Sequence, residues 1–221
     1  MIKSKKAQKS VFWESLILAI FIFVSGILLG YFLEQNRTSK IIGLYQESEL
    51  NMLDIKIQDS IFSLSDVNCD NFLKETIVFA DKIYGEAQLL DRYEESSKIT
   101  QGIILQHKKY DLLRTLLWIE TIKFKEKCNN DFETIVYFYE YKSDSMDIKS
   151  KQDIFSKKLE EVKNKHGNEV ILIPIAGNLD ISSVSYLMEQ NNISTLPAIL
   201  INEKVKISSI EELSLIDSYL N

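Results

Sequence analysis

The fold is predicted most directly from the segment Ser194-Thr-Leu-Pro-Ala-Ile-Leu-Ile201. A turn ends in proline, and the four apolar residues after it are enough for a short buried strand. Similar signals flank this stretch on both sides. The polar turn Asn202-Glu-Lys204 leads to a return strand at 205–207, and the apolar run 170–176 predicts another buried strand upstream.

The segments on either side of 194–201 predict an alternation of strands and helices. The run 134–140 is rich in β-branched and aromatic residues and is expected to be the first strand. Gly167 is the expected C-cap of the helix over 148–165, and Ser209 and Glu212 have capping-box spacing at the start of the helix over 208–220. Three helices with apolar residues at helical spacing are expected over 148–165, 180–190 and 208–220.

The order strand-helix-strand-helix-strand-strand-helix, with Thr195-Leu196-Pro197 directly before the third strand, resembles the thioredoxin fold. The resemblance covers residues 131–221. It implies an α/β domain with a mixed sheet flanked by helices, and a cis-proline at Pro197 that faces an active-site turn. The chain is also similar to membrane-anchored thioredoxin-like proteins of archaeal type. Those place a helical region with two flanking cysteines between one N-terminal span and the thioredoxin domain.

The chain departs from thioredoxins at the turn where that family carries Cys-x-x-Cys. This turn falls on Ser145-Met146-Asp147-Ile148 or, two residues earlier, on the pair Ser143 and Met146. Neither register supplies a thiol, and a serine hydroxyl is not ionised near neutral pH, so no catalytic residue is expected at this degenerate turn. The loop Thr195-Leu196-Pro197 would keep the family's other role, which is to offer backbone groups to an extended peptide.

The region 34–130 predicts an all-α stalk and a helical hairpin. An apolar stripe follows residues 50–64, and two more helices are expected over about 70–96 and 100–127, with their apolar stripes used for packing. Cys69 precedes the first of these two helices and Cys128 follows the second. An antiparallel hairpin would bring the two thiols together. We expect a stapling disulfide, and a redox-active pair is the alternative.

The N-terminus predicts a membrane anchor. The tip 1–10 carries four lysines and no acid, and the apolar run 11–33 has no charge from Leu16 onward. Eighteen such residues span about 27 Å as a helix, close to the hydrocarbon thickness of a bilayer. The run ends without a cleavage signal, so we expect an uncleaved signal anchor in the cell membrane. The lysines place the N-terminus in the cytoplasm and all residues after the span outside.

Within the span, Gly26 and Gly30 form a GxxxG pair that would allow a homodimer. The rest of the chain is acidic. The 221 residues contain 26 basic and 32 acidic side chains, a net charge of −6. Removing the four lysines and the one glutamate of the first 33 residues leaves 22 basic and 31 acidic, a net charge of −9 for the body. This balance argues against a nucleic-acid partner.

Two cysteines are too few for an all-cysteine zinc site, two histidines argue against a His-rich metal site, and no cofactor is expected. His107 is interpreted as a solvated residue on a helix face, and His166 as a helix-end residue. Asn36 and Asn192 match the N-glycosylation pattern.

These observations favour a redox-inactive, thioredoxin-like protein, tethered to the membrane, that binds protein or peptide partners outside the cell. The alternative is a thiol–disulfide oxidoreductase that uses Cys69 and Cys128. A third hypothesis is a purely structural stalk with a passive cap. The predicted domains are a basic tip (1–10), a transmembrane anchor (11–33), a helical stalk and hairpin (34–130) and a thioredoxin-like domain (131–221).

Overall fold

The computed structural model describes residues 12–33, 69–96, 101–128 and 132–220, together with single positions 35, 46, 50, 53–54, 56–57 and 60. The chain forms two units, Met1–Gln46 and Glu47–Asn221, and each is described by itself. The predicted basic tip and the glycosylation pattern at Asn36 lie outside the described residues.

The described part of the first unit includes the helix Phe12–Leu33, with a mean hydropathy of 2.7. Its 22 residues extend about 33 Å, which is long enough to cross a bilayer. Trp13 and Tyr31 stand near its two ends with 57% and 68% of their surfaces exposed. A Cβ atom added at Gly26 or Gly30 would meet no other atom within 4 Å. The predicted homodimer through these glycines stays a prediction.

The second unit is built on a mixed four-stranded sheet with the order β2-β1-β3-β4. The central strand β1 is parallel to β2 and antiparallel to β3, and β4 is antiparallel to β3. All four predicted strands are therefore confirmed within about one residue of their expected ends. The strands are β1 (Glu133–Tyr139), β2 (Val170–Ala176), β3 (Ala198–Ile201) and β4 (Val205–Ile207).

One face of the sheet is covered by the helix α4 (Met146–His166) and the 3-10 helix η2 (Glu211–Tyr219). A single-turn 3-10 helix, η1 (Gly167–Glu169), follows α4. Gly167 caps α4 as predicted, with a φ of 56° and its N–H donated to the carbonyl of Lys163. The core on this face is apolar, and its members are Ile135, Tyr137, Phe155, Leu159, Val162, Val170, Ile199, Ile201, Ile207, Leu213, Ile216 and Leu220.

Two predicted helices differ in detail. The helix expected from residue 180 is α5 (Ser182–Gln190), because Asp180 has a φ of 52° and this left-handed conformation cannot begin an α-helix. The closing α-helix expected over 208–220 is the shorter 3-10 helix η2. Glu212 accepts from the backbone N–H groups of Ser208 and Ser209 at 3.2 and 3.3 Å, so the predicted capping contact is present.

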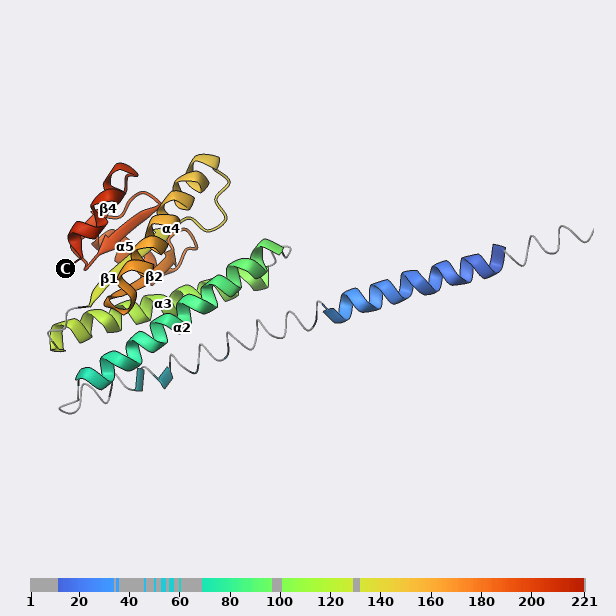
Figure 1. Ribbon diagram of the computed structural model, residues 1–221, viewed down its shortest axis with the longest axis horizontal. Coiled ribbons are helices and arrows are strands. Elements are labelled where there is room, and N and C mark those ends of the chain that lie inside the picture. The colour runs from blue at the N-terminus through green and yellow to red at the C-terminus, as the bar shows by residue number, and fades with distance from the viewer. Residues whose placement is uncertain are drawn as a thin grey trace, which may run out of the picture. The chain divides into compact units, whose positions relative to one another are not determined.

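A helical hairpin covers the other side of the sheet (Figure 1). Its helices are α2 (Cys69–Ser96) and α3 (Gln101–Cys128), which confirms the predicted pair. α2 contacts α3 and β2, whereas α3 also contacts β1 and α5. Within residues 47–221 the hairpin and the sheet therefore form one compact unit, across the predicted boundary between residues 130 and 131.

Trp118 joins α3 to the sheet. Its side chain is completely buried and meets Phe138 of β1 edge to face, with 5.8 Å between ring centroids. Its indole N–H donates to Glu203 in the β3–β4 turn at 2.7 Å. One turn short of the end of α3, the ammonium of Lys125 donates to Asn202 in the same turn at 2.6 Å. The hairpin is thus held by both packing and polar contacts.

The predicted packing stripes are confirmed in part. Phe79 and Ile83 of α2 are buried, as are Leu113 and Leu117 of α3. Leu112, which lies in the helix expected over 100–127 and is apolar, is 47% exposed, so it is not part of a packed stripe. The stripe expected over 50–64 is described at only three of its apolar positions, Leu50, Leu53 and Ile57, and these are all exposed.

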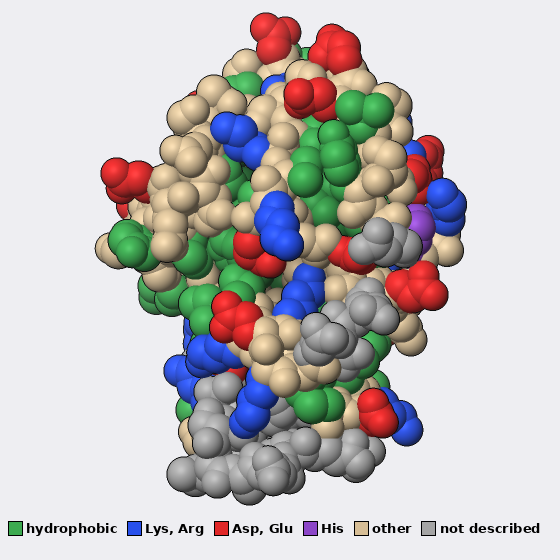
Figure 2. Space-filling view, turned by 90° about the vertical axis from the view of Figure 1, so that its left-hand side faces the viewer, with side chains coloured by type: hydrophobic (Ala, Val, Ile, Leu, Met, Phe, Trp, Pro, Cys, Tyr) green, Lys and Arg blue, Asp and Glu red, His purple; other side chains and the backbone are tan. Residues whose placement is uncertain are grey.

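Asp217 ties η2 to the end of α4. Its carboxylate accepts from Lys165 at 2.7 Å, from Lys158 at 3.0 Å and from His166 at 3.2 Å. His166 is thus a helix-end residue, as predicted. Hydrogen bonds from Lys165, Lys158 and His166, in that order of size, hold the pKa of Asp217 well below its usual range. Acidic and basic side chains are similarly interspersed over the face shown in Figure 2.

We expect Asp217→Asn to lower the free energy of unfolding at pH 7 by about 1 kcal/mol, because Asp217 is 29% exposed and water screens its ion pairs. The pKa is lower in the folded state, so this stabilisation is complete above the unfolded-state pKa near 4 and is lost as the pH falls below it. Urea unfolding between pH 7 and pH 2 should show the difference between Asp217→Asn and the wild type shrinking with acid. Asp144→Asn, at an exposed position, is the control and should leave the profile unchanged.

Candidate functional site

Three loops meet at one edge of the sheet. Phe138 near the end of β1 pairs with Ala198 at the start of β3, so the turn after β1 and the loop before β3 are neighbours. The N–H of Gly177, directly after β2, donates to the carbonyl of Tyr139 at 2.8 Å. The predicted degenerate turn and the predicted proline loop therefore lie at the same edge, as their sequence positions led us to expect.

Side-chain amides fix the backbone of the degenerate turn. Asn178 accepts from the N–H of Tyr141 at 2.7 Å and donates to its carbonyl at 2.9 Å. Gln152 contacts the N–H and the carbonyl of Glu140 in the same way, at 2.7 and 3.2 Å. The turn is held in one conformation by the elements on either side of it.

The serines of the turn have structural partners in both registers. Ser145 is the N-cap of α4, and its hydroxyl accepts from the N–H of Ile148 at 3.4 Å. Ser143 is buried, and its hydroxyl accepts from the N–H of Ser145 at 3.3 Å. Asp147 lies in the first turn of α4, where a carboxylate is favourable. Met146 projects into solvent and is 71% exposed.

The loop before β3 contains a cis peptide bond between Leu196 and Pro197, as the resemblance implied. Thr195 is exposed and Leu196 half-buried, whereas Pro197 itself is buried. Leu196 packs so closely on Gly177 that a Cβ at residue 177 would lie 3.0 Å from its Cδ1 atom. The accessible surface of this loop is therefore formed by Thr195 and Leu196, and the ring of Pro197 contributes little to it.

The backbone of this loop has unused hydrogen-bonding capacity. Within the described part of the chain, the N–H and C=O groups of Ser194, Thr195 and Leu196 make no hydrogen bond. An open cavity of about 480 Å³ lies beside the loop, between Gly177 and the end of α5, and Met188, Asn192 and Ser194 are among its lining residues. Asn192 is exposed there, so its predicted glycosylation stays a prediction.

The sequence interpretation of His107 is wrong. This residue is 1% exposed and lies beneath the degenerate turn. Its Nε2 atom is 2.8 Å from the hydroxyl of Tyr139, and its ring packs on that of Tyr141 with 4.1 Å between centroids. α3 contacts α2 as well as the sheet, so a polar residue on it can be fully buried.

His107 belongs to a buried polar cluster with Asp111 and Arg114. Asp111 lies 3.4 Å from Nε2 of His107 and 3.1 Å from Arg114. Burial raises the pKa of Asp111, and Arg114, His107 and a backbone contact with Ala176 oppose that shift. Burial also raises the pKa of Tyr137 on the other face of β1. The spacing of His107, Asp111 and Arg114, at steps of four and three, is the sequence signal that could have revealed this face.

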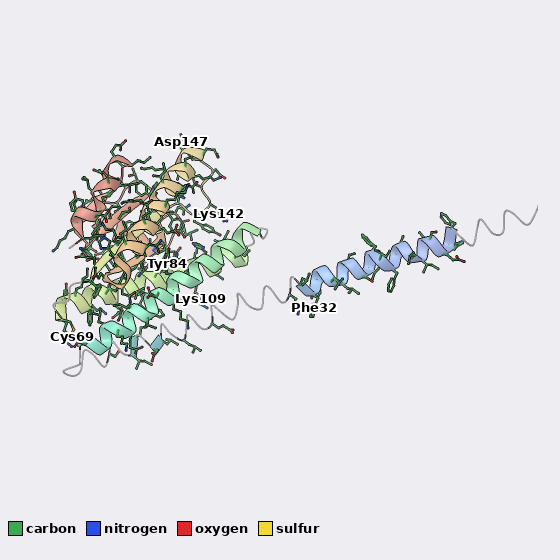
Figure 3. The ribbon with its side chains drawn as sticks, in the orientation of Figure 1. Phe32, Cys69, Tyr84, Lys109, Lys142 and Asp147 are labelled. Carbon is green, nitrogen blue, oxygen red and sulfur yellow. A yellow bond between two sulfur atoms is a disulfide. The ribbon has the colours of Figure 1, made fainter. Side chains whose placement is uncertain are left out.

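The predicted disulfide is present. Cys69, the first residue of α2, is bonded to Cys128, the last residue of α3, with 5.9 Å between their Cα atoms. From His107 to Cys128 is 21 residues, or about 32 Å along α3. Figure 3 shows Cys69 at the opposite end of the hairpin from the turn marked by Lys142 and Asp147. The disulfide and the degenerate turn are therefore separate sites.

Among the described residues, no three His, Cys, Asp or Glu side chains converge in a way that would bind a metal ion. No protein-family model matches the chain, and no curated protein matches it either. Among solved structures, the chain is similar to the crystal structure of thioredoxin O2 from Arabidopsis thaliana in its oxidized state. The two are 13% identical, with 48% of this chain and 90% of that chain covered and a TM-score of 0.33.

Proposed function

We propose that this chain is a redox-inactive, thioredoxin-like protein that is tethered to the cell membrane and binds protein or peptide partners on the outer face. The order of its strands and helices supports the thioredoxin-like part of the proposal. So does the cis peptide bond between Leu196 and Pro197, because it directly precedes β3 at the edge where β1 turns into α4.

One observation carries the binding role: the loop Ser194–Leu196 has free backbone groups beside a turn without thiols. Exposed backbone N–H and C=O groups at a sheet edge can pair with an extended peptide as an added strand. Ser143 and Ser145 hold the backbone of the neighbouring turn and supply no nucleophile. The site can therefore bind a strand without performing disulfide exchange.

The tether and its orientation rest on the N-terminal sequence. The helix Phe12–Leu33 has the length and hydropathy of a membrane span. The four lysines before it favour a cytoplasmic N-terminus and an exterior body. The Cys69–Cys128 disulfide supports this orientation, because structural disulfides persist mainly outside the reducing cytoplasm.

The oxidoreductase alternative has less support. Cys69 and Cys128 are half-buried, and the bond between them closes the end of a hairpin about 32 Å along α3 from the degenerate turn. A catalytic pair needs a low-pKa thiolate that a substrate can reach. A peptide bound at the loop Ser194–Leu196 would lie too far from Cys69 and Cys128 to react with them.

The experiment uses intact cells that carry the tagged full chain, treated with a crosslinker that cannot cross membranes. We expect partner proteins to be captured with the wild type. With Thr195→Arg their recovery should fall about tenfold, because a bulky charged side chain would block an added strand. Mass spectrometry of the purified complexes measures both outcomes.

Ser214→Arg is the matched control, since Ser214 is also small and exposed but lies on η2. It should leave recovery unchanged. Equal recovery with Thr195→Arg and the wild type would rule out the loop as the contact surface. Failure of the reagent to modify the chain on intact cells would instead contradict the exterior location. Pro197→Ala is a weaker test because Pro197 is buried and its loss would also disturb the fold.

A further inference from the structure

A second cavity, of about 300 Å³, lies between the helical hairpin and α4. It shares no lining residue with the cavity beside the proline loop. Tyr84 of α2, labelled in Figure 3, and Arg114 of α3 line it from the hairpin. Leu172 and Pro174 of β2 and Tyr139 of β1 also line it. Its volume is at the lower end of the range for small-molecule sites.

The positive charge that lines this cavity has a counterion, whereas its two carboxylates have none among the described residues. Arg114 is buried and is 3.1 Å from Asp111, so its positive charge already has a counterion. Asp153 and Glu160 line the cavity from α4 and are exposed. They are seven residues apart, so they lie two turns apart on one face of the helix. Neither carboxylate makes an ion pair or a hydrogen bond with any residue that the structure describes.

Several lysines of α4 donate hydrogen bonds to groups that do not line this cavity. Lys158 donates to Asp217, Lys163 to Asp81, and Lys151 to the carbonyl of Ser208. Lys157 lies between Asp153 and Glu160 on the same face, is exposed, and forms no ion pair with either within the described chain. It reduces the negative charge at the mouth of the cavity but does not cancel it.

We propose that this cavity binds an organic cation with a short apolar stem, either a primary ammonium or a guanidinium. Asp153 and Glu160 hold the cation at the mouth. The stem contacts the apolar lining at Leu172 and Pro174, and the tyrosine rings offer π-surface on which a cation is favourable. The site does not rest on the proposed role of Thr195, since the two cavities are separate.

The test is a titration of the full chain in zwitterionic nanodiscs with n-pentylamine, followed by ligand-detected NMR against empty nanodiscs. Pentanol and pentanoate have stems of the same length with no charge and with a negative charge. We expect pentylamine to bind more tightly than pentanol, and pentanoate to bind least. Equal binding of all three would overturn the proposal, because the cavity would then recognise only the stem.

Four single substitutions and one double variant locate the binding. Asp153→Asn and Glu160→Gln should each weaken pentylamine binding about two- to fivefold, the usual effect of one exposed ion pair, and their effects should multiply in the double variant. Lys157→Gln should tighten binding by a similar factor. Glu161→Gln is the control, because Glu161 is adjacent to Glu160 on α4 and does not line the cavity. An unchanged double variant, or an equal effect of Glu161→Gln, would overturn the assignment.

A free amine and the lysine side chain of a peptide share this chemistry, and a second probe separates them. Nα-acetyl-lysine amide carries the same ammonium and stem on a peptide backbone. If it binds as tightly as pentylamine, the cavity accepts a basic side chain of a polypeptide. If it binds at least tenfold more weakly while pentylamine is retained, the ligand is a free alkylamine.

Discussion

Replacing Trp118 by alanine should lower the free energy of unfolding of the unit Glu47–Asn221 by about 3–5 kcal/mol, the usual cost of truncating a buried aromatic residue. The side chain is completely buried, packs against Phe138 and donates to Glu203. Its loss would leave a cavity where α3 meets the sheet. Urea unfolding of the full chain in micelles, followed by far-UV circular dichroism, measures the change without relying on tryptophan fluorescence.

Two further variants define the cause. Leu112→Ala changes a 47% exposed residue of the same helix and should cost less than about 1 kcal/mol. Trp118→Phe keeps most of the packing and loses only the hydrogen bond to Glu203, so it should cost about 1–2 kcal/mol. An effect of Trp118→Ala no larger than that of Leu112→Ala would mean that the hairpin and the sheet are not held together at this residue.

The second large effect concerns the disulfide. Replacing Cys69 and Cys128 together by serine should lower the free energy of unfolding by about 4 kcal/mol, because the bond closes a loop of about 60 residues and restricts the unfolded chain. The wild type in the presence of dithiothreitol should unfold at the same urea concentration as the double variant. The double variant itself should not respond to the reductant.

The redox behaviour of the wild-type protein distinguishes a structural disulfide from a catalytic pair. A structural disulfide should have a reduction potential below about −300 mV and stay oxidised in glutathione buffers. Insulin reduction that turns over with the wild type and disappears in Cys69→Ser would support the oxidoreductase alternative. A wild type whose stability is unaffected by reduction would show that the bond contributes nothing to the fold.

The sheet could be predicted from the sequence because its strands are short, apolar and bounded by strong turn signals. Pro197 and the Asn202-Glu-Lys204 turn delimit β3 on both sides, and the structure places its ends there. The hairpin was equally clear from its periodicity and from the positions of its cysteines. These features are local: each depends on a few neighbouring residues and on the backbone conformations they favour.

The environment of α3 could not be predicted in the same way. A histidine followed by two lysines has the composition of a solvated helix face, yet His107 is buried, with Tyr139 at the end of β1 and Tyr141 of the degenerate turn packed against it. Whether a helix is covered on one side or on several depends on partners distant in the sequence. The same reason explains Pro197: its place in the loop could be predicted, but its burial is set by the surrounding tertiary packing.

The position of the disulfide has a mechanical consequence for a tethered chain. If the helix Phe12–Leu33 tethers the chain as proposed, a pull from the membrane would reach α2 at Cys69, and β1 begins only five residues after Cys128. The covalent bond carries this load directly from one residue to the other, so α2 and α3 lie in a loop that bears no tension. If the bond were reduced, those 59 residues would join the load path and could add about 200 Å of extensible chain. In a chain tethered as proposed, the bond would therefore set the reach of the tether, and it also holds the ends of the hairpin together.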